Sequence, residues 1–140
     1  MTAPAKLLFD ENFGKPMIVA VTPFLEKYQP KPVIAHLLDY FAAGVTDAMW
    51  IPKVATEGWI VVSGDRGKKS GGAKLPEVCA AHAVTHVLLS GTLQNDRQFR
   101  KVQSIIAVWD ELMQLTSCVK GSRYLLRLTP SRKPVLMKRH

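Results

Sequence analysis

Residues 47–65 combine a helix pattern with a strand pattern, and this order narrows the possible folds more than any other part of the chain. The first half has apolar residues at helical spacing. Asp47 suits its first turn, where a carboxylate meets the positive end of the helix dipole. Gly58 suits the C-terminal cap of that helix. Residues 59–62 are typical of a strand buried on both faces, and Asp65 follows that strand. A helix followed closely by a fully buried strand predicts an α/β protein.

The rest of the chain repeats this alternation. In chain order, the other predicted elements are a strand at 6–10, a helix at 16–28, a strand at 33–38, a helix at 75–83, a strand at 85–89, a long helix at 95–117, an edge strand at 123–128 and a short strand at 135–137. Residues 33–38 are also compatible with a helix that runs on through Phe41. The strand is favoured because prolines precede it. This order predicts one domain over residues 1–140, a three-layer α/β/α sandwich with a mainly parallel central sheet.

The long helix at 95–117 is predicted to begin at Asn95 or Asp96 and to bury one apolar stripe. That stripe consists of Phe99, Val102, Ile106, Trp109 and Met113. Its first turns carry three basic side chains, Arg97, Arg100 and Lys101. Positive charge is mildly unfavourable there, so these residues suit a solvated face and are useful if phosphates lie nearby.

Basic residues are concentrated in the last third of the chain. Of the net charge of +8, residues 1–95 contribute +1 (nine basic and eight acidic side chains), and residues 96–140 contribute +7 (ten basic and three acidic). Such a segment suits a polyanionic partner such as RNA, and a merely basic surface explains it equally well. Arg66, Lys68 and Lys69 lie in a glycine-rich basic loop. The loop is not a P-loop, because Ala73 follows its last glycine where that motif needs Lys-Ser or Lys-Thr.

Carboxylates follow the predicted strands. Asp10 and Glu11 come directly after the first strand, Asp39 after the second and Asp65 after the third, and Asp47 opens the helix before that third strand. The carboxyl ends of parallel strands meet at one edge of a sheet, where ligands bind in open α/β folds. Oxygen ligands are what a hard divalent cation prefers, so the pattern predicts a cation site at this edge.

Two segments of this pattern resemble the PIN-domain family of metal-dependent ribonucleases, in its short PIN-like branch related to VapC-type toxins. The first is residues 7–12, Leu-Leu-Phe-Asp-Glu-Asn. The second is Asp47-Ala48 followed by Ala55, Gly58 and residues 61–66, Val-Val-Ser-Gly-Asp-Arg. The resemblance covers about residues 6–90.

The resemblance implies an endoribonuclease, the toxin of a toxin–antitoxin pair, that cleaves RNA with Mg²⁺ or Mn²⁺. Asp10, Asp47 and Asp65 would bind the metal, with Glu11 as a further catalytic residue. Possible auxiliary residues are Asn12, Asp39 and Ser63. RNA would be held by Arg66, Lys68, Lys69, Arg97, Arg100 and Lys101. A protein antitoxin and a homodimer are the other implied partners.

One element of the family pattern is missing, because no residue matches the glutamate that the standard family carries on a central helix. The alternative function is therefore a catalytically eroded PIN-like module that binds RNA or a protein. A receiver-like phosphorylation domain is a third hypothesis, since Asp10-Glu11 and Ser90-Gly91-Thr92 also suit that fold. Asp65 counts against it, because Arg66-Gly67 follows where a receiver usually has a Met-Pro turn.

The remaining features predict a cytoplasmic protein without a membrane segment. No apolar run approaches the roughly 20 residues that a membrane helix needs, and the N-terminus lacks the pattern of a signal peptide. Cys79 and Cys118 lie far apart without metal-binding spacing, which favours reduced thiols. His36, His82 and His86 also lack such spacing and are interpreted as core or surface histidines.

Overall fold

The computed structural model describes residues 4–64, 75–118 and 120–139. These residues form a six-stranded sheet in the order β2-β1-β3-β4-β5-β6. The strands are β1 (Lys6–Phe9), β2 (Val33–His36), β3 (Ile60–Ser63), β4 (His86–Leu89), β5 (Arg123–Leu128) and β6 (Pro134–Arg139). All neighbouring pairs are parallel except β5 and β6, which are antiparallel. The mainly parallel sheet is confirmed.

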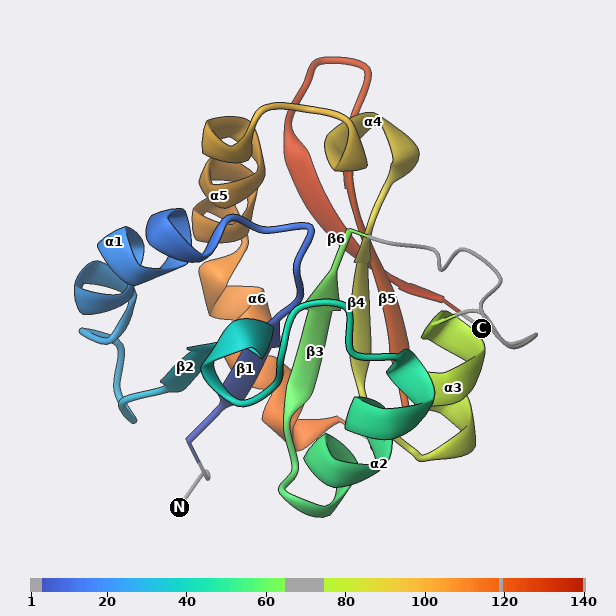
Figure 1. Cartoon of the computed structure of the whole chain (residues 1–140). Coiled ribbons are helices and arrows are strands. Elements are labelled where there is room, and N and C mark those ends of the chain that lie inside the picture. Colours follow the sequence, from blue (N-terminus) through green and yellow to red (C-terminus); the bar gives the residue numbers. More distant parts are fainter. Residues whose placement is uncertain (1–3, 65–74, 119, 140) are drawn as a thin grey trace.

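Helices cover both faces of this sheet (Figure 1). They are α1 (Lys15–Leu25), α2 (Asp47–Thr56), α3 (Leu75–Ala81), α4 (Gly91–Gln94), α5 (Gln98–Ala107) and α6 (Trp109–Met113), with 3₁₀ turns η1 (Leu37–Asp39) and η2 (Gln114–Ser117). In Figure 1, α2 and α3 lie in front of the sheet and α6 lies behind it. Among the described helices, none is long and apolar enough to cross a membrane.

Alternation along the strands builds two cores. In β1, Leu7 and Phe9 belong to a core completed by α1, α5 and α6, whereas Leu8 belongs to a core completed by α2 and α3. Successive side chains of a strand point to opposite faces, so a strand buried on both sides is apolar throughout. All four residues of β3 and of β4 are buried accordingly. The three-layer α/β/α sandwich is thus confirmed.

Three predicted elements differ from the structure. The strand predicted at 33–38 ends at His36, because the side chains of His36 and Asp39 cap the turn η1. The predicted long helix is broken at Val108, whose φ of −110° and ψ of 20° leave the helical region, and α5 begins after Arg97 rather than at Asn95 or Asp96. Residues 123–128 are not an edge strand, because β6 pairs with β5 and forms the edge itself.

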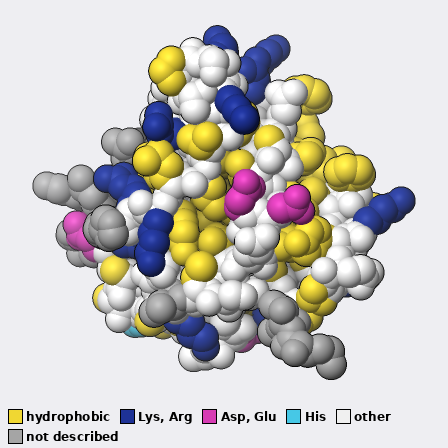
Figure 2. All heavy atoms as spheres, turned by 180° about the vertical axis from the view of Figure 1, so that it is seen from behind, with side chains coloured by type: hydrophobic (Ala, Val, Ile, Leu, Met, Phe, Trp, Pro, Cys, Tyr) yellow, Lys and Arg dark blue, Asp and Glu magenta, His cyan; other side chains and the backbone are white. Residues whose placement is uncertain are grey.

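The face formed by α1, α5 and α6 leaves apolar side chains exposed around a pair of acidic groups (Figure 2). Phe24, Phe99 and Ile106 are among its exposed hydrophobic residues. A groove of about 360 Å³ lies between α1 and the α5–α6 segment. Phe99 and Ile106 therefore do not belong to the buried stripe that the helical pattern predicted, and Ile105 lies in the core instead.

Candidate functional site

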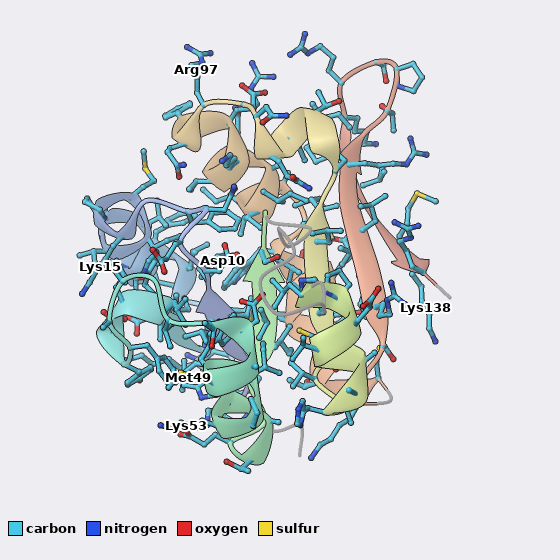
Figure 3. All side chains as sticks on the ribbon, turned by 45° about the vertical axis from the view of Figure 1, so that its right-hand side comes forward. Asp10, Lys15, Met49, Lys53, Arg97 and Lys138 are labelled. Carbon is cyan, nitrogen blue, oxygen red and sulfur yellow. The ribbon has the colours of Figure 1, made fainter. Side chains whose placement is uncertain are left out.

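A pocket of about 290 Å³ lies at the carboxyl ends of β1 and β2, beside the first turns of α2 and α3. Its lining residues are Asp10, Glu11, Asn12, Leu37, Val45, Asp47, Trp50 and Leu75. The structure thus brings together four of the predicted site residues from two segments that are far apart in the sequence. Figure 3 shows Asp10 in the interior, between α2 and α5, while Arg97 and Lys53 project from opposite ends of the molecule.

Asp10 directly follows β1 and is only 6% exposed. Its backbone N–H donates to the carbonyl of Val62 (3.2 Å), which continues the pairing of β1 with β3 by one residue. Its Oδ1 accepts a hydrogen bond from the backbone N–H of Asn12 (3.1 Å). This bond is an Asx turn, in which an aspartate holds the backbone two residues on. The carboxylate is therefore fixed by both the sheet and the turn that follows it.

Asp47 is the first residue of α2, where the helix dipole favours a negative charge. Its Oδ1 accepts a hydrogen bond (3.0 Å) from Nε1 of Trp50, one turn further along the helix. Trp50 is only 1% exposed, so the contact anchors the carboxylate to a side chain that cannot move freely. The indole thus orients Asp47 at the pocket wall.

Glu11 lies at the exposed mouth of the pocket. Its Oε1 accepts a hydrogen bond (3.3 Å) from the backbone N–H of Gly44. Gly44 has a φ of 81°, a left-handed backbone that favours glycine. This contact connects the end of β1 to the loop that precedes α2, and so links the two segments that carry Asp10 and Asp47.

Asn12 is held by two side chains of α5 that come more than eighty residues later. Gln98 Nε2 donates to the carbonyl of Asn12 (2.8 Å), and Gln98 Oε1 accepts from the backbone N–H of Gly14 (2.7 Å). Lys101 Nζ donates to the same carbonyl (3.2 Å) and to Asn12 Oδ1 (2.7 Å). Sequence reasoning missed this role of α5. In the sequence, the only sign of this role is the three-residue spacing of Gln98 and Lys101, which places both side chains on one face of the helix.

Gly64 lies against the side chain of Asn12. A Cβ atom at Gly64 would overlap the amide of Asn12, so a larger residue there would displace the Asn12 side chain. Asp65 is the next residue, but it lies outside the residues that the structure describes, as do Arg66, Lys68 and Lys69. The close approach of Asn12 to Gly64 brings the chain at the end of β3 next to the turn that carries Asp10.

Two predicted auxiliary residues do not line this pocket. Asp39 pairs with Lys15 (2.9 Å) and accepts the backbone N–H of His36 (2.8 Å). Burial favours a higher pKa of Asp39, but these two partners outweigh it and hold the pKa below its usual value. Ser63 is completely buried, and its Oγ lies 3.1 Å from Nε2 of His86. Asp39 therefore stabilises η1, and Ser63 bonds within the sheet.

The predicted RNA-binding residues of α5 lie in different settings. Arg97 is exposed at the start of the helix, and Arg100 is half-buried. Arg100 lines a second cavity of about 360 Å³ with Arg132, between α5 and the turn that joins β5 to β6. Lys101 is only 4% exposed, which differs from the solvated face predicted for it. Its burial lowers the pKa of the ammonium, against the opposing effect of the Asp10 and Asp96 carboxylates.

The donor chemistry of the pocket fits a hard divalent cation. Asp10, Glu11 and Asp47 bring carboxylate oxygens to its lining, the ligands that Mg²⁺ and Mn²⁺ prefer. Within residues 4–64, 75–118 and 120–139, no group of three His, Cys, Asp or Glu side chains is close enough to hold a metal.

The Cys79 thiol lies near these carboxylates. Burial raises the pKa of this thiol to about 12, and the negative charges of Asp47 and Asp10 add to this rise.

Comparison with known proteins identifies the family. A family model described as a PIN-like domain matches residues 5–88, which is more than half of the chain and includes Asp10, Asp47 and Asp65. No curated protein and no solved structure matches the chain. PIN-like domains are typically nucleases, so the match indicates a nuclease-type function and favours it over the receiver-like interpretation. The chain belongs to the PIN-like domain family.

Proposed function

We propose that the protein is a metal-dependent endoribonuclease. The observation that carries the proposal is the pocket at the sheet edge, where Asp10 of one segment and Asp47 of another lie together with Glu11. Like charges repel when no cation is near, so two anchored carboxylates at one pocket are more readily explained by a bound cation than by stability. The nuclease-type function of the family agrees with this chemistry.

Asp10 and Asp47 would hold Mg²⁺ or Mn²⁺ in this proposal, with Asp65 as the third ligand predicted from the sequence. When bound, such an ion stabilises the developing charge of a phosphodiester and makes a water molecule more acidic. The protein holds the carboxylate side chains in fixed positions. The Asn12 turn holds Asp10, and Trp50 holds Asp47. Glu11 at the mouth of the pocket would orient a water or the substrate. RNA would lie along the basic residues of α5 and the β5–β6 turn.

The role of a toxin with a protein antitoxin, and the homodimer, belong to this proposal through the family resemblance. Sedimentation of the purified chain checks the dimer directly, because a dimer has twice the 15.5 kDa mass of the chain. Co-expression with the product of an adjacent gene checks the antitoxin. Suppression of both cleavage and growth arrest is the expected result.

The decisive experiment measures cleavage of a mixed-sequence RNA with Mg²⁺ or Mn²⁺. Asp10→Asn and Asp47→Asn are expected to lose activity by more than the roughly 10–100-fold typical of residues that only support a metal ligand. Asp110→Asn is the matched control, because Asp110 is exposed on α6 away from the pocket. Its activity is expected to equal that of the native chain.

Two other outcomes of these measurements would overturn parts of the proposal. If the native chain binds Mn²⁺ and RNA but cuts no RNA, the alternative of a catalytically eroded binding module replaces the nuclease. If Asp10→Asn and Asp47→Asn bind Mn²⁺ as tightly as the native chain does, the proposed metal ligands are wrong. Calorimetric Mn²⁺ titration of all three proteins distinguishes these outcomes from a loss of folding, which circular dichroism reports separately.

A further inference from the structure

Lys101 is a charged side chain in a position where charge is rare. It lies on α5 with 4% of its surface exposed, and lysine is almost never buried to this degree unless it is paired. Its Nζ donates to the carbonyl and to the side-chain Oδ1 of one residue, Asn12. Both acceptors belong to the turn that follows β1. The side chain therefore reaches from the helix layer to the carboxyl edge of the sheet.

Asn12 connects this ammonium to the candidate metal ligand Asp10. Its side chain accepts from Lys101 (2.7 Å), and its backbone N–H donates to Asp10 Oδ1 (3.1 Å). Asn12 thus contacts the Lys101 ammonium through its side chain and the Asp10 carboxylate through its backbone. Asn12 also lines the same pocket as Asp10 and Asp47. The positive charge of Lys101 is therefore held in a fixed position relative to the Asp10 carboxylate.

Support of the Asn12 turn alone does not require a lysine. Gln98 already donates to the Asn12 carbonyl and accepts from the backbone of Gly14, so a neutral side chain of the same helix performs that task. What Lys101 adds is charge in a partly dehydrated position, where a cation acts more strongly on nearby carboxylates than it would in water. Burying that charge has a cost that a methionine at this position would avoid.

We infer that Lys101 is the built-in cation of the Asp10–Asp47 pocket, which offsets the repulsion between its carboxylates and restricts the pocket to one divalent ion. This inference rests on the proposed function, because it takes Asp10 and Asp47 as the ligands of that ion. Lys101 acts through Asn12 and Asp10 and is a positioning residue. A second divalent ion would have to approach both the first ion and the ammonium, and both repel it.

The test is a calorimetric titration of Lys101→Met with Mn²⁺ alone, without RNA. The native chain is expected to bind one Mn²⁺. Removal of a nearby positive charge is expected to tighten Mn²⁺ binding by about tenfold or more, or to admit a second ion. RNA cleavage is expected to fall in the same variant. A merely structural lysine predicts the opposite for the metal, because a loosened Asp10 binds Mn²⁺ more weakly.

Two further variants serve as controls. Lys138→Met removes the same charge from the exposed β6 strand at the edge of the molecule (Figure 3), where solvent and salt screen it. Its Mn²⁺ affinity is expected to stay within about twofold of the native value. Lys101→Arg keeps the charge and is expected to restore the native stoichiometry of one ion. Circular dichroism checks that each variant is folded.

The Mn²⁺ titrations test the inference about Lys101 separately from the nuclease proposal. If the native chain binds one Mn²⁺ and Lys101→Met also binds only one, equally or more weakly, the inference about Lys101 is overturned and the nuclease proposal stands. Two ions in the native chain also overturn the inference, and this result does not depend on the folding of any variant. No Mn²⁺ binding by the native chain overturns both.

Discussion

His86 lies on β4 with 2% of its surface exposed, and its Nε2 is 3.1 Å from Oγ of Ser63. Burial, with a smaller contribution from the positive charge of Arg123, lowers its pKa to about 4. The unfolded chain has an ordinary histidine pKa of about 6.5. Between these two values the unfolded chain binds a proton that the folded chain does not bind. The free energy of unfolding therefore falls as the pH falls from about 6.5 to about 4.

This difference predicts that His86 accounts for about 2–3 kcal/mol of the stability lost between pH 7.5 and pH 4.5. Urea unfolding at the two pH values is expected to show that His86→Gln loses less stability on acidification than the native chain by this amount. His82→Gln is the control, because His82 is exposed. Equal pH dependence of the native chain and the His86 variant would show that His86 does not stay neutral in the fold.

At the scale of elements, the orientation of α5 about its own axis decides which residues reach the site. The helix buries Val102 and Ile105 in the core and directs Lys101 toward Asn12, while Phe99 is 66% exposed. The apolar stripe predicted from the sequence included Phe99 and Ile106 and excluded Ile105. Val102, Trp109 and Met113 of that stripe are buried as predicted, so the prediction is wrong only at Phe99 and Ile106. It also assigned Lys101 to the solvated face, although this side chain points inward.

The orientation of α5 predicts unequal effects of two truncations. Ile105→Ala is expected to lower the free energy of unfolding by about 2–5 kcal/mol, because it leaves a cavity in the core. Phe99→Ala is expected to change it by no more than about 0.5 kcal/mol, as is usual for surface substitutions. Urea unfolding at pH 7.5 measures both values. A larger loss for Phe99→Ala than for Ile105→Ala would contradict the packing described for α5.

At the scale of the whole molecule, the pairing of β6 with β5 brings one basic residue of the last third, Arg132, beside α5. Arg100 and Arg132 are thirty-two positions apart in the sequence and line one cavity. Pro134 and Leu128 lie at the base of the turn that carries Arg132. The antiparallel pairing of β5 with β6 places that turn beside the helix. In the proposed function, this pair of arginines would contact the RNA backbone.

The proposed RNA path predicts a specific salt dependence. If each arginine contacts one phosphate, Arg100→Gln and Arg132→Gln are each expected to reduce the slope of log affinity against log salt concentration by about 0.7. Lys53→Gln is the control, because Lys53 projects from the opposite end of the molecule (Figure 3). Fluorescence anisotropy with a single-stranded RNA over a range of KCl concentrations measures the slopes. Unchanged slopes for both arginine variants would exclude this cavity from the RNA path.

The class of the fold and the neighbourhood of the site follow from patterns in the sequence. Short apolar strands alternating with amphipathic helices specify a covered parallel sheet, because each pattern is local and each apolar face must be buried. Parallel strands then bring their carboxyl ends to one edge. For this reason the sequence alone predicts Asp10 and Asp47 at one pocket, where the structure has them. Asp65, the third predicted ligand, lies outside the described residues.

The contacts of the supporting residues depend on the packing of the whole chain. Asp39 caps η1 and pairs with Lys15, and Lys101 turns inward to Asn12, eighty-nine positions earlier in the chain. The strand β6 pairs antiparallel with β5, so β5 is an interior strand of the sheet. Apart from the capping of η1 by Asp39, which contacts His36 three positions earlier, none of these outcomes follows from local spacing. Each depends on which side chains the packed layers bring within hydrogen-bond distance, and a small rotation of a helix about its axis is enough to exchange a buried residue for an exposed one.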